Sequence, residues 1–317
     1  MRLATVDLGS RTAAAVILAD GSALLLDALS ATDLPPAVSA AFASGSLLKV
    51  IAAGPAAREA AGCAAAEAAA GRLAHAIRSA DSLRLLAPVP HPAKNVVCVG
   101  RNYAEHIAEG ERAQNIKIGI TEYPVFFTKP ATAVIGPGET IPIFPHLSTK
   151  IDYEVELAVV IGKAGRDIPP ERALEHVYGY TILNDVTARD IQRRHGGQYF
   201  KGKGLDGSCP MGPWIVTADE VPDPAKLGIR LWVNGEARQD GNTAAMIFDI
   251  PTLIASMSEG MTVEPGDILA TGTPSGVGYA MDPPGFLKDG DVVTCEIDGI
   301  GRLENPVRIV EAARRVA

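Results

Sequence analysis

The chain lacks the features that would assign it at once to a nucleic-acid-binding or membrane class. It has no cluster of Lys and Arg, and its net charge of −8 provides no electrostatic footprint for nucleic acid or an anionic membrane surface. No apolar run approaches the roughly 20 residues that span a bilayer, and the N-terminus does not have the pattern of a signal peptide. We therefore expect a soluble, cytoplasmic protein with no nucleic-acid or membrane partner.

Cysteine is also scarce. The four cysteines, at positions 63, 98, 209 and 295, form no C-x-x-C motif and no Cys/His cluster. This excludes the usual zinc and dithiol sites, and we interpret the thiols as buried or incidental in a reducing compartment.

Two common catalytic signatures are missing or incomplete. The chain has no G-x-S-x-G motif, which argues against a serine hydrolase. The segment from Gly197 to Lys203 matches most of a phosphate-binding loop, but Gly204 stands where Ser or Thr is needed and no hydrophobic strand precedes it. The glycines of residues 271–278, TGTPSGVG, have the wrong spacing for a dinucleotide fingerprint, so a loop lining a pocket explains them better.

What is present indicates two parts. Residues 1–85 predict a small N-terminal α/β domain, with strands over 2–8, 12–18 and 23–26 and a surface helix over the alanine-rich segment 56–79. The Pro-rich stretch 87–95 marks the junction. Residues 86–317 then show short β-branched runs at irregular intervals, which predict an α+β, β-rich domain.

The segment DYEVEL contains the most informative pair of acids. On a strand, Glu154 and Glu156 point to the same face, and the apolar run that follows them leads into an interior. A third acid, Asp185, stands where an apolar run ends. Three carboxylates without Cys or His suit a hard cation such as Mg²⁺ or Mn²⁺. A solvated strand face for the two glutamates and a helix N-cap for Asp185 remain the alternatives.

A histidine and a glutamate provide a candidate base. His106 and Glu109 have the i, i+3 spacing that places both on one face of a helical turn, where the carboxylate could orient the imidazole for proton abstraction. A surface pair is the alternative. The polar stretch 109–123 that follows is typical of a mobile lid.

Several motifs occur together in a fixed order, and they make the chain resemble the fumarylacetoacetate hydrolase family from about residue 95 to residue 307. These motifs are GRNYAEH, FTKP, DYEVELAVVIG, GYTILNDVTARDIQ, KGLDGSCPMGPW and ATGTPSGVG. The resemblance implies a mixed β-roll catalytic domain, a homodimer and a small 2-oxo acid as the substrate.

The resemblance also implies roles for individual residues. It implies that one Mg²⁺ or Mn²⁺ per subunit is held by Glu154, Glu156 and Asp185, and that His106 and Glu109 form the dyad that activates water. It places Lys203 and Gln192 among the catalytic groups, with Lys201 two residues away. Arg189, Thr273 and Lys129 are implied to contact or lie near the substrate, although buried pairing is an equal alternative for Lys129.

The implied chemistry is metal-assisted cleavage of a carbon–carbon bond in an acylpyruvate such as fumarylpyruvate. Hydroxide would add to the distal carbonyl and a pyruvate enolate would leave. Decarboxylation of oxaloacetate and isomerisation of a hydroxydienedioate need the same enolate, so both remain open alternatives.

Overall fold

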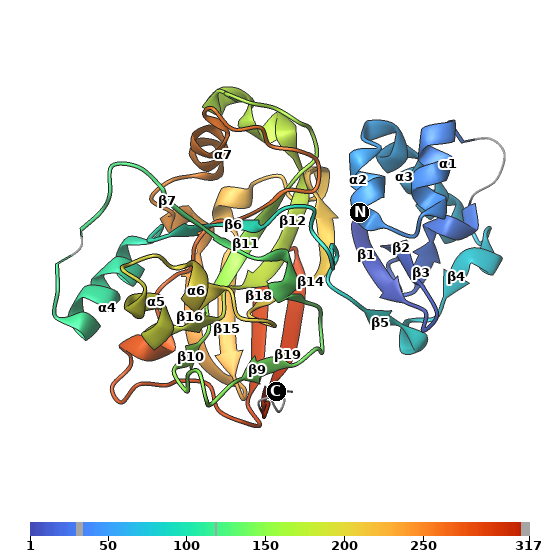
Figure 1. The fold of residues 1–317 in the computed structure, drawn as a ribbon. Coiled ribbons are helices and arrows are strands. Elements are labelled where there is room, and N and C mark those ends of the chain that lie inside the picture. Colours follow the sequence, from blue (N-terminus) through green and yellow to red (C-terminus); the bar gives the residue numbers. More distant parts are fainter. Residues whose placement is uncertain (30–33, 118, 312–317) are drawn as a thin grey trace, which may run out of the picture.

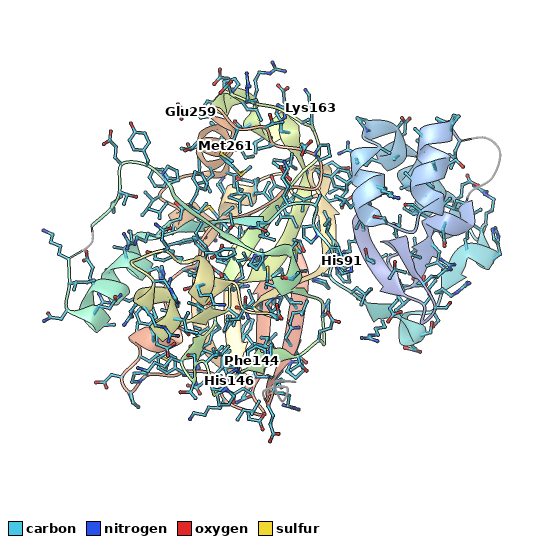
Figure 2. All side chains as sticks on the ribbon, in the orientation of Figure 1. His91, Phe144, His146, Lys163, Glu259 and Met261 are labelled. Carbon is cyan, nitrogen blue, oxygen red and sulfur yellow. The ribbon has the colours of Figure 1, made fainter. Side chains whose placement is uncertain are left out.

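The computed structural model describes residues 1–29, 34–117 and 119–311, and it shows a mixed α+β, β-rich protein. Figure 1 shows a small N-terminal lobe beside a larger lobe. The segment 87–95 connects them, and His91, labelled in Figure 2, lies in this connection.

The N-terminal lobe packs helices against a short antiparallel sheet. Its elements are β1 (Arg2–Asp7), β2 (Thr12–Ile17), β3 (Ala23–Leu25), α1 (Pro36–Ala43), α2 (Leu47–Ala52), α3 (Pro55–Ala69), β4 (Ile77–Arg78) and β5 (Arg84–Leu85). Gly21, at a φ of 84°, makes the tight turn between β2 and β3.

One sheet runs through both lobes. Of the described strands, twelve belong to it, in the order β4-β3-β2-β1-β14-β12-β11-β17-β6-β7, with β5 paired to β1 and β8 to β14. The strands of the larger lobe in this sheet are β6 (Val96–Gly100), β7 (Val125–Lys129), β8 (Val134–Ile135), β11 (Val155–Ile161), β12 (Val177–Asn184), β14 (Cys209–Thr217) and β17 (Ile268–Ala270).

A second sheet closes the roll against the first. Its order is β16-β15-β18-β19-β9, and residues of its strands share one hydrophobic core with β11 and β12. Its strands are β9 (Ile141–Ile143), β15 (Gly228–Val233), β16 (Glu236–Asn242), β18 (Val292–Ile297) and β19 (Gly301–Ile309). A short ladder joins β10 (Ile151–Asp152) to β13 (Thr187–Ala188).

Three short helices flank the strand ends that carry the predicted site. They are α4 (Ala104–Gln114), α5 (Arg189–Arg194) and α6 (Phe200–Lys203). Figure 1 shows α4 on the side of the large lobe away from the N-terminal lobe. A further helix, α7 (Ile250–Ser258), lies at another end of the molecule, near the labelled Glu259 and Met261 in Figure 2.

Most strand predictions are confirmed, whereas one helix prediction is wrong at its end. The predicted helix over 56–79 stops at Ala69, because Gly71 adopts a φ of 80° and Ile77–Arg78 form a strand that pairs with β3. The N-cap alternative for Asp185 is also wrong, since α5 begins only at Arg189 and has no side-chain cap.

Candidate metal centre and active site

Two neighbouring strands bring the three predicted acids together. Glu154 directly precedes β11, Glu156 lies in it, and Asp185 follows β12, the antiparallel neighbour of β11. The Asp185 amide donates a hydrogen bond of 2.8 Å to the Glu154 carbonyl, which closes this end of the pair. All three side chains are buried, and one carboxylate oxygen from each lies within 4.8 Å of the others.

The electrostatics of this cluster fit a divalent cation. Burial and the nearby Asp185 and Glu154 carboxylates raise the pKa of Glu156 well above its ordinary value. Burial alone would also raise the pKa of Glu154, but Lys203 and Arg189 lower it below its ordinary value. Within the described residues Glu156 forms no ion pair, whereas Glu154 and Asp185 do, and a hard cation bound by three oxygens would relieve the repulsion at Glu156.

Lys203 is placed inside this cluster. Its Nζ lies 2.7 Å from Glu154 Oε2 and 2.6 Å from Asp185 Oδ2. Burial lowers the pKa of Lys203, but the two carboxylates outweigh it and raise the pKa, so the group stays cationic. Lys201 is exposed, which favours Lys203 over Lys201 as the functional lysine.

Lys129 lies behind the carboxylates and does not line the cavity. Its fully buried Nζ donates to Asp185 Oδ1 at 2.7 Å, to the Val186 carbonyl at 3.0 Å and to the Lys203 carbonyl. Direct substrate contact is thus not its role in this structure. Buried pairing, which the sequence left open for this lysine, is what the structure shows.

The predicted dyad forms on α4. His106 Nδ1 lies 2.8 Å from Glu109 Oε1, and Glu109 Oε2 accepts a hydrogen bond of 2.8 Å from the Gly276 amide. One carboxylate therefore orients the imidazole and joins α4 to the glycine-rich loop. The other ring nitrogen of His106 is left for chemistry.

His106 and the acids line one cavity of about 250 Å³. Glu154, Glu156, Arg189, Gln192, Lys203 and Thr273 also line it. Arg189 Nη1 lies 3.4 Å from Gln192 Oε1. The hydroxyl of Thr273 donates to the Val155 carbonyl and accepts from Gln239, so it is already engaged by the protein.

Both glycine-rich segments contribute residues to the lining of this cavity. Lys203, in the incomplete phosphate-loop motif, is buried against carboxylates. In the TGTPSGVG loop, the Gly272 amide donates to Glu156 Oε2 at 2.8 Å. Gly272 has a φ of 101°, a conformation that favours glycine.

Sequence reasoning missed two groups that hold Arg189. Asp152 is fully buried and accepts a 2.8 Å hydrogen bond from Arg189 Nε, and the Tyr279 ring lies 4.3 Å from the guanidinium carbon. Asp152 stands two residues before Glu154 in the DYEVE motif, in phase with the alternation that selected Glu154 and Glu156, so the same pattern could have found it. Tyr279 reaches the site only through the long TGTPSGVG loop, which no local pattern reveals.

Two further expectations can be checked against the described residues. Cys98, Cys209 and Cys295 are buried and Cys63 is exposed, and all four are free thiols. In the part of the chain that the structure describes, no helix has the length and apolar character needed to cross a membrane.

Comparison with known proteins gives a consistent family. The model of the fumarylacetoacetate (FAA) hydrolase C-terminal family matches residues 95–308. Oxaloacetate tautomerase YisK of Bacillus subtilis is 49% identical over 230 residues, which cover 72% of this chain and 74% of that protein.

Solved structures agree over nearly the whole chain. A fumarylacetoacetate hydrolase from Exiguobacterium antarcticum has a TM-score of 0.78 and 42% identity, covering 98% of this chain and 100% of its own. Maleylpyruvate hydrolase from Sphingobium sp. SYK-6, in complex with manganese(II) and pyruvate, has a TM-score of 0.71 and 33% identity. This match covers 98% of the present chain and 99% of the hydrolase chain. The chain belongs to the fumarylacetoacetate hydrolase family of enzymes.

Proposed function

We propose that this protein is a metal-dependent tautomerase that interconverts the keto and enol forms of oxaloacetate. The observation that carries the proposal is the oriented imidazole of His106, which lines the same cavity as three clustered carboxylates. The similarity to an oxaloacetate tautomerase at 49% identity supports this reaction over hydrolysis, which we expected from the sequence.

The metal site has a defined set of donors. Glu154, Glu156 and Asp185 would hold Mg²⁺ or Mn²⁺, and the bound ion would act as a Lewis acid that polarises the 2-oxo group and acidifies the neighbouring C–H. The manganese found in the related maleylpyruvate hydrolase supports this choice of ion.

His106 is the proposed base. It accepts a proton from carbon 3 of the 2-oxo acid, and the electron pair of that C–H bond forms the enol double bond. Glu109 stabilises the resulting imidazolium through the contact at Nδ1. Return of the proton to the 2-oxygen gives the enol and regenerates neutral His106.

Two cations stabilise the negative charge that builds up on the substrate. Lys203 and Arg189 line the cavity and stay charged because buried carboxylates surround them. They therefore offer fixed positive charge at the site without moving during the reaction.

Hydrolysis of an acylpyruvate is the second candidate function. The same His106–Glu109 pair could take a proton from water in place of carbon, and a maleylpyruvate hydrolase shares this fold at 33% identity.

The test follows the near-ultraviolet absorbance of enol-oxaloacetate on metal-stripped protein, before and after addition of Mg²⁺ or Mn²⁺. We expect metal-dependent acceleration of ketonisation without release of pyruvate. His106→Gln should remove it, while His91→Gln, which changes an exposed histidine in the connecting segment, should not. Cleavage of acylpyruvates to pyruvate with no effect on oxaloacetate would replace the proposal by the second candidate.

A further inference from the structure

We propose that Arg101 binds the distal carboxylate of the substrate and thereby selects 2-oxo dicarboxylates over 2-oxo monocarboxylates. This inference rests on the proposed function and names the residue that sets its specificity for a dicarboxylate. Arg101 lies directly after β6 and before α4, so it stands between the central sheet and the helix that carries His106. It lines the same cavity as His106 and Glu154.

Arg101 differs from the buried cations near the cavity in the charged groups that surround it. Lys203, Lys129 and Arg189 are each paired with carboxylates of the protein, at 2.6 to 2.8 Å. Within residues 1–29, 34–117 and 119–311, no carboxylate forms an ion pair with the half-buried Arg101. A guanidinium in such a place is suited to an anionic group from outside the protein.

The backbone holds Arg101 in an unusual conformation. Its φ is 60°, and of the described non-glycine residues with positive φ it is the one that lines the cavity. The next residue, Asn102, is fully buried, and its side chain bonds the Phe248 carbonyl, the Thr271 carbonyl and the Phe248 amide. These bonds fix the position of Arg101, as expected where a strained residue serves a ligand.

Arg193 is the competing cation, and its surroundings differ. It also lines the cavity, but its side chain is exposed and its guanidinium already stacks on Tyr279, at 5.3 Å from the ring centre. It stands in the last turn of the short helix α5. The backbone of Arg101 is held in place, so Arg101 is the better defined binding position for a carboxylate.

The test uses two chelating 2-hydroxy acids that differ only in the distal carboxylate and cannot form an enol by tautomerisation. Malate has this carboxylate and lactate does not. Calorimetric titration of the Mg²⁺-loaded full chain gives the dissociation constants for the wild type, Arg101→Gln, Arg193→Gln and Arg194→Gln. Arg194 is the matched control because it is exposed and does not line the cavity.

We expect the wild type to bind malate at least about tenfold more tightly than lactate, the range given by one charge-assisted contact. Arg101→Gln should lose this preference and leave lactate binding within about twofold, while Arg194→Gln keeps it. If Arg101→Gln does not fold, Arg101→Asn replaces it, because Asn tolerates positive φ better.

Equal affinity of the wild type for both acids would overturn the proposal. A preference for malate that survives in Arg101→Gln would also overturn it. The same holds if Arg101→Gln weakens the binding of malate and lactate equally. Binding of these acids requires no turnover, so the two proposals can fail independently. A failure of the tautomerase assay would refute the proposed function, and the binding preference for malate would still be tested by the calorimetric titration.

Discussion

Glu154 and Glu156 are two residues apart, yet their surroundings give their charges opposite effects on stability. Glu154 is paired with Lys203 and Arg189, at 2.7 and 2.6 Å, whereas Glu156 receives one hydrogen bond from the Gly272 amide and faces two other carboxylates. In the metal-free protein, ionised Glu154 therefore stabilises the fold and ionised Glu156 destabilises it.

This difference predicts opposite effects for two matched substitutions in metal-free protein. Glu154→Gln leaves buried cations short of a partner and should reduce the free energy of unfolding by about 3 kcal/mol. Glu156→Gln removes like-charge repulsion and should leave that free energy unchanged or raise it. Both should abolish metal-dependent turnover. Denaturant unfolding in the presence of a chelator measures this, and equal destabilisation by both variants would contradict it.

The raised pKa of Glu156 also predicts a pH dependence. At a pH above 4.5, the ordinary pKa of this glutamate, the unfolded state loses the proton, whereas the metal-free folded state keeps it. The folded state therefore loses stability as the pH rises toward the raised pKa. Between pH 4.5 and the raised pKa of Glu156, the wild type should lose stability relative to Glu156→Gln, by up to about 1.4 kcal/mol per pH unit. A constant difference between the two proteins over this range would exclude the effect.

The sequence predicted the three acids that the structure brings together, because strand alternation places Glu154 and Glu156 on one face and Asp185 stands at the end of an apolar run. Arg101 and Tyr279 could not be predicted as site residues. Their positions depend on a strained backbone and a long loop, which leave no periodic signal.

At the scale of elements, α4 and the loop after β17 form one unit. Glu109 accepts a hydrogen bond from the Gly276 amide, and Ser275 Oγ lies 3.2 Å from Glu105, so the helix with His106 is joined to the loop whose Gly272 amide bonds Glu156. Whether residues 109–123 move as a lid remains a prediction, and Ile118 within them lies outside the described residues.

The close approach of α4 to this loop gives a prediction for Gly110. A Cβ at this position would lie 2.5 Å from Tyr279 Oη, so Gly110→Ala must displace α4 or Tyr279. We expect kcat to fall about tenfold, the size typical of a misplaced catalytic group. The double variant with Tyr279→Phe, which lacks the clashing oxygen, should recover most of the rate. Tyr279→Phe alone is the control, and a double variant as slow as Gly110→Ala would refute the clash.

Strand prediction succeeded where β-branched runs are long, as in β11 and β12. The end of the helix over 56–79 was missed because alanine favours helix along the entire run, whereas pairing of Ile77–Arg78 with β3 is a tertiary effect. The strand β19 was also missed, since its charged and apolar residues alternate without a β-branched run.

At the scale of the whole molecule, the two lobes share structure. Arg2 and Leu3 of β1 pair with Val216 and Ile215 of β14, and one buried cluster includes side chains from both lobes. The proposed boundary at residue 85 therefore divides the sequence but not the sheet. The homodimer and the cytoplasmic location remain predictions.

Continuity of the sheet predicts that residues 86–317 will not fold stably alone. Removing residues 1–85 would expose the edge of β14 and the apolar side chains of the shared cluster. The full chain should unfold in one calorimetric transition, and the fragment should aggregate. A monodisperse, active fragment would show that the larger lobe is an independent domain.

The most direct test of metal-dependent tautomerisation is the rate of enol-oxaloacetate ketonisation on metal-stripped protein with and without added Mg²⁺. We expect acceleration only with the metal, and its loss in His106→Gln and in Glu156→Gln. An unchanged rate after the metal is removed, or full activity in Glu156→Gln, would contradict a carboxylate-held ion working with a histidine base.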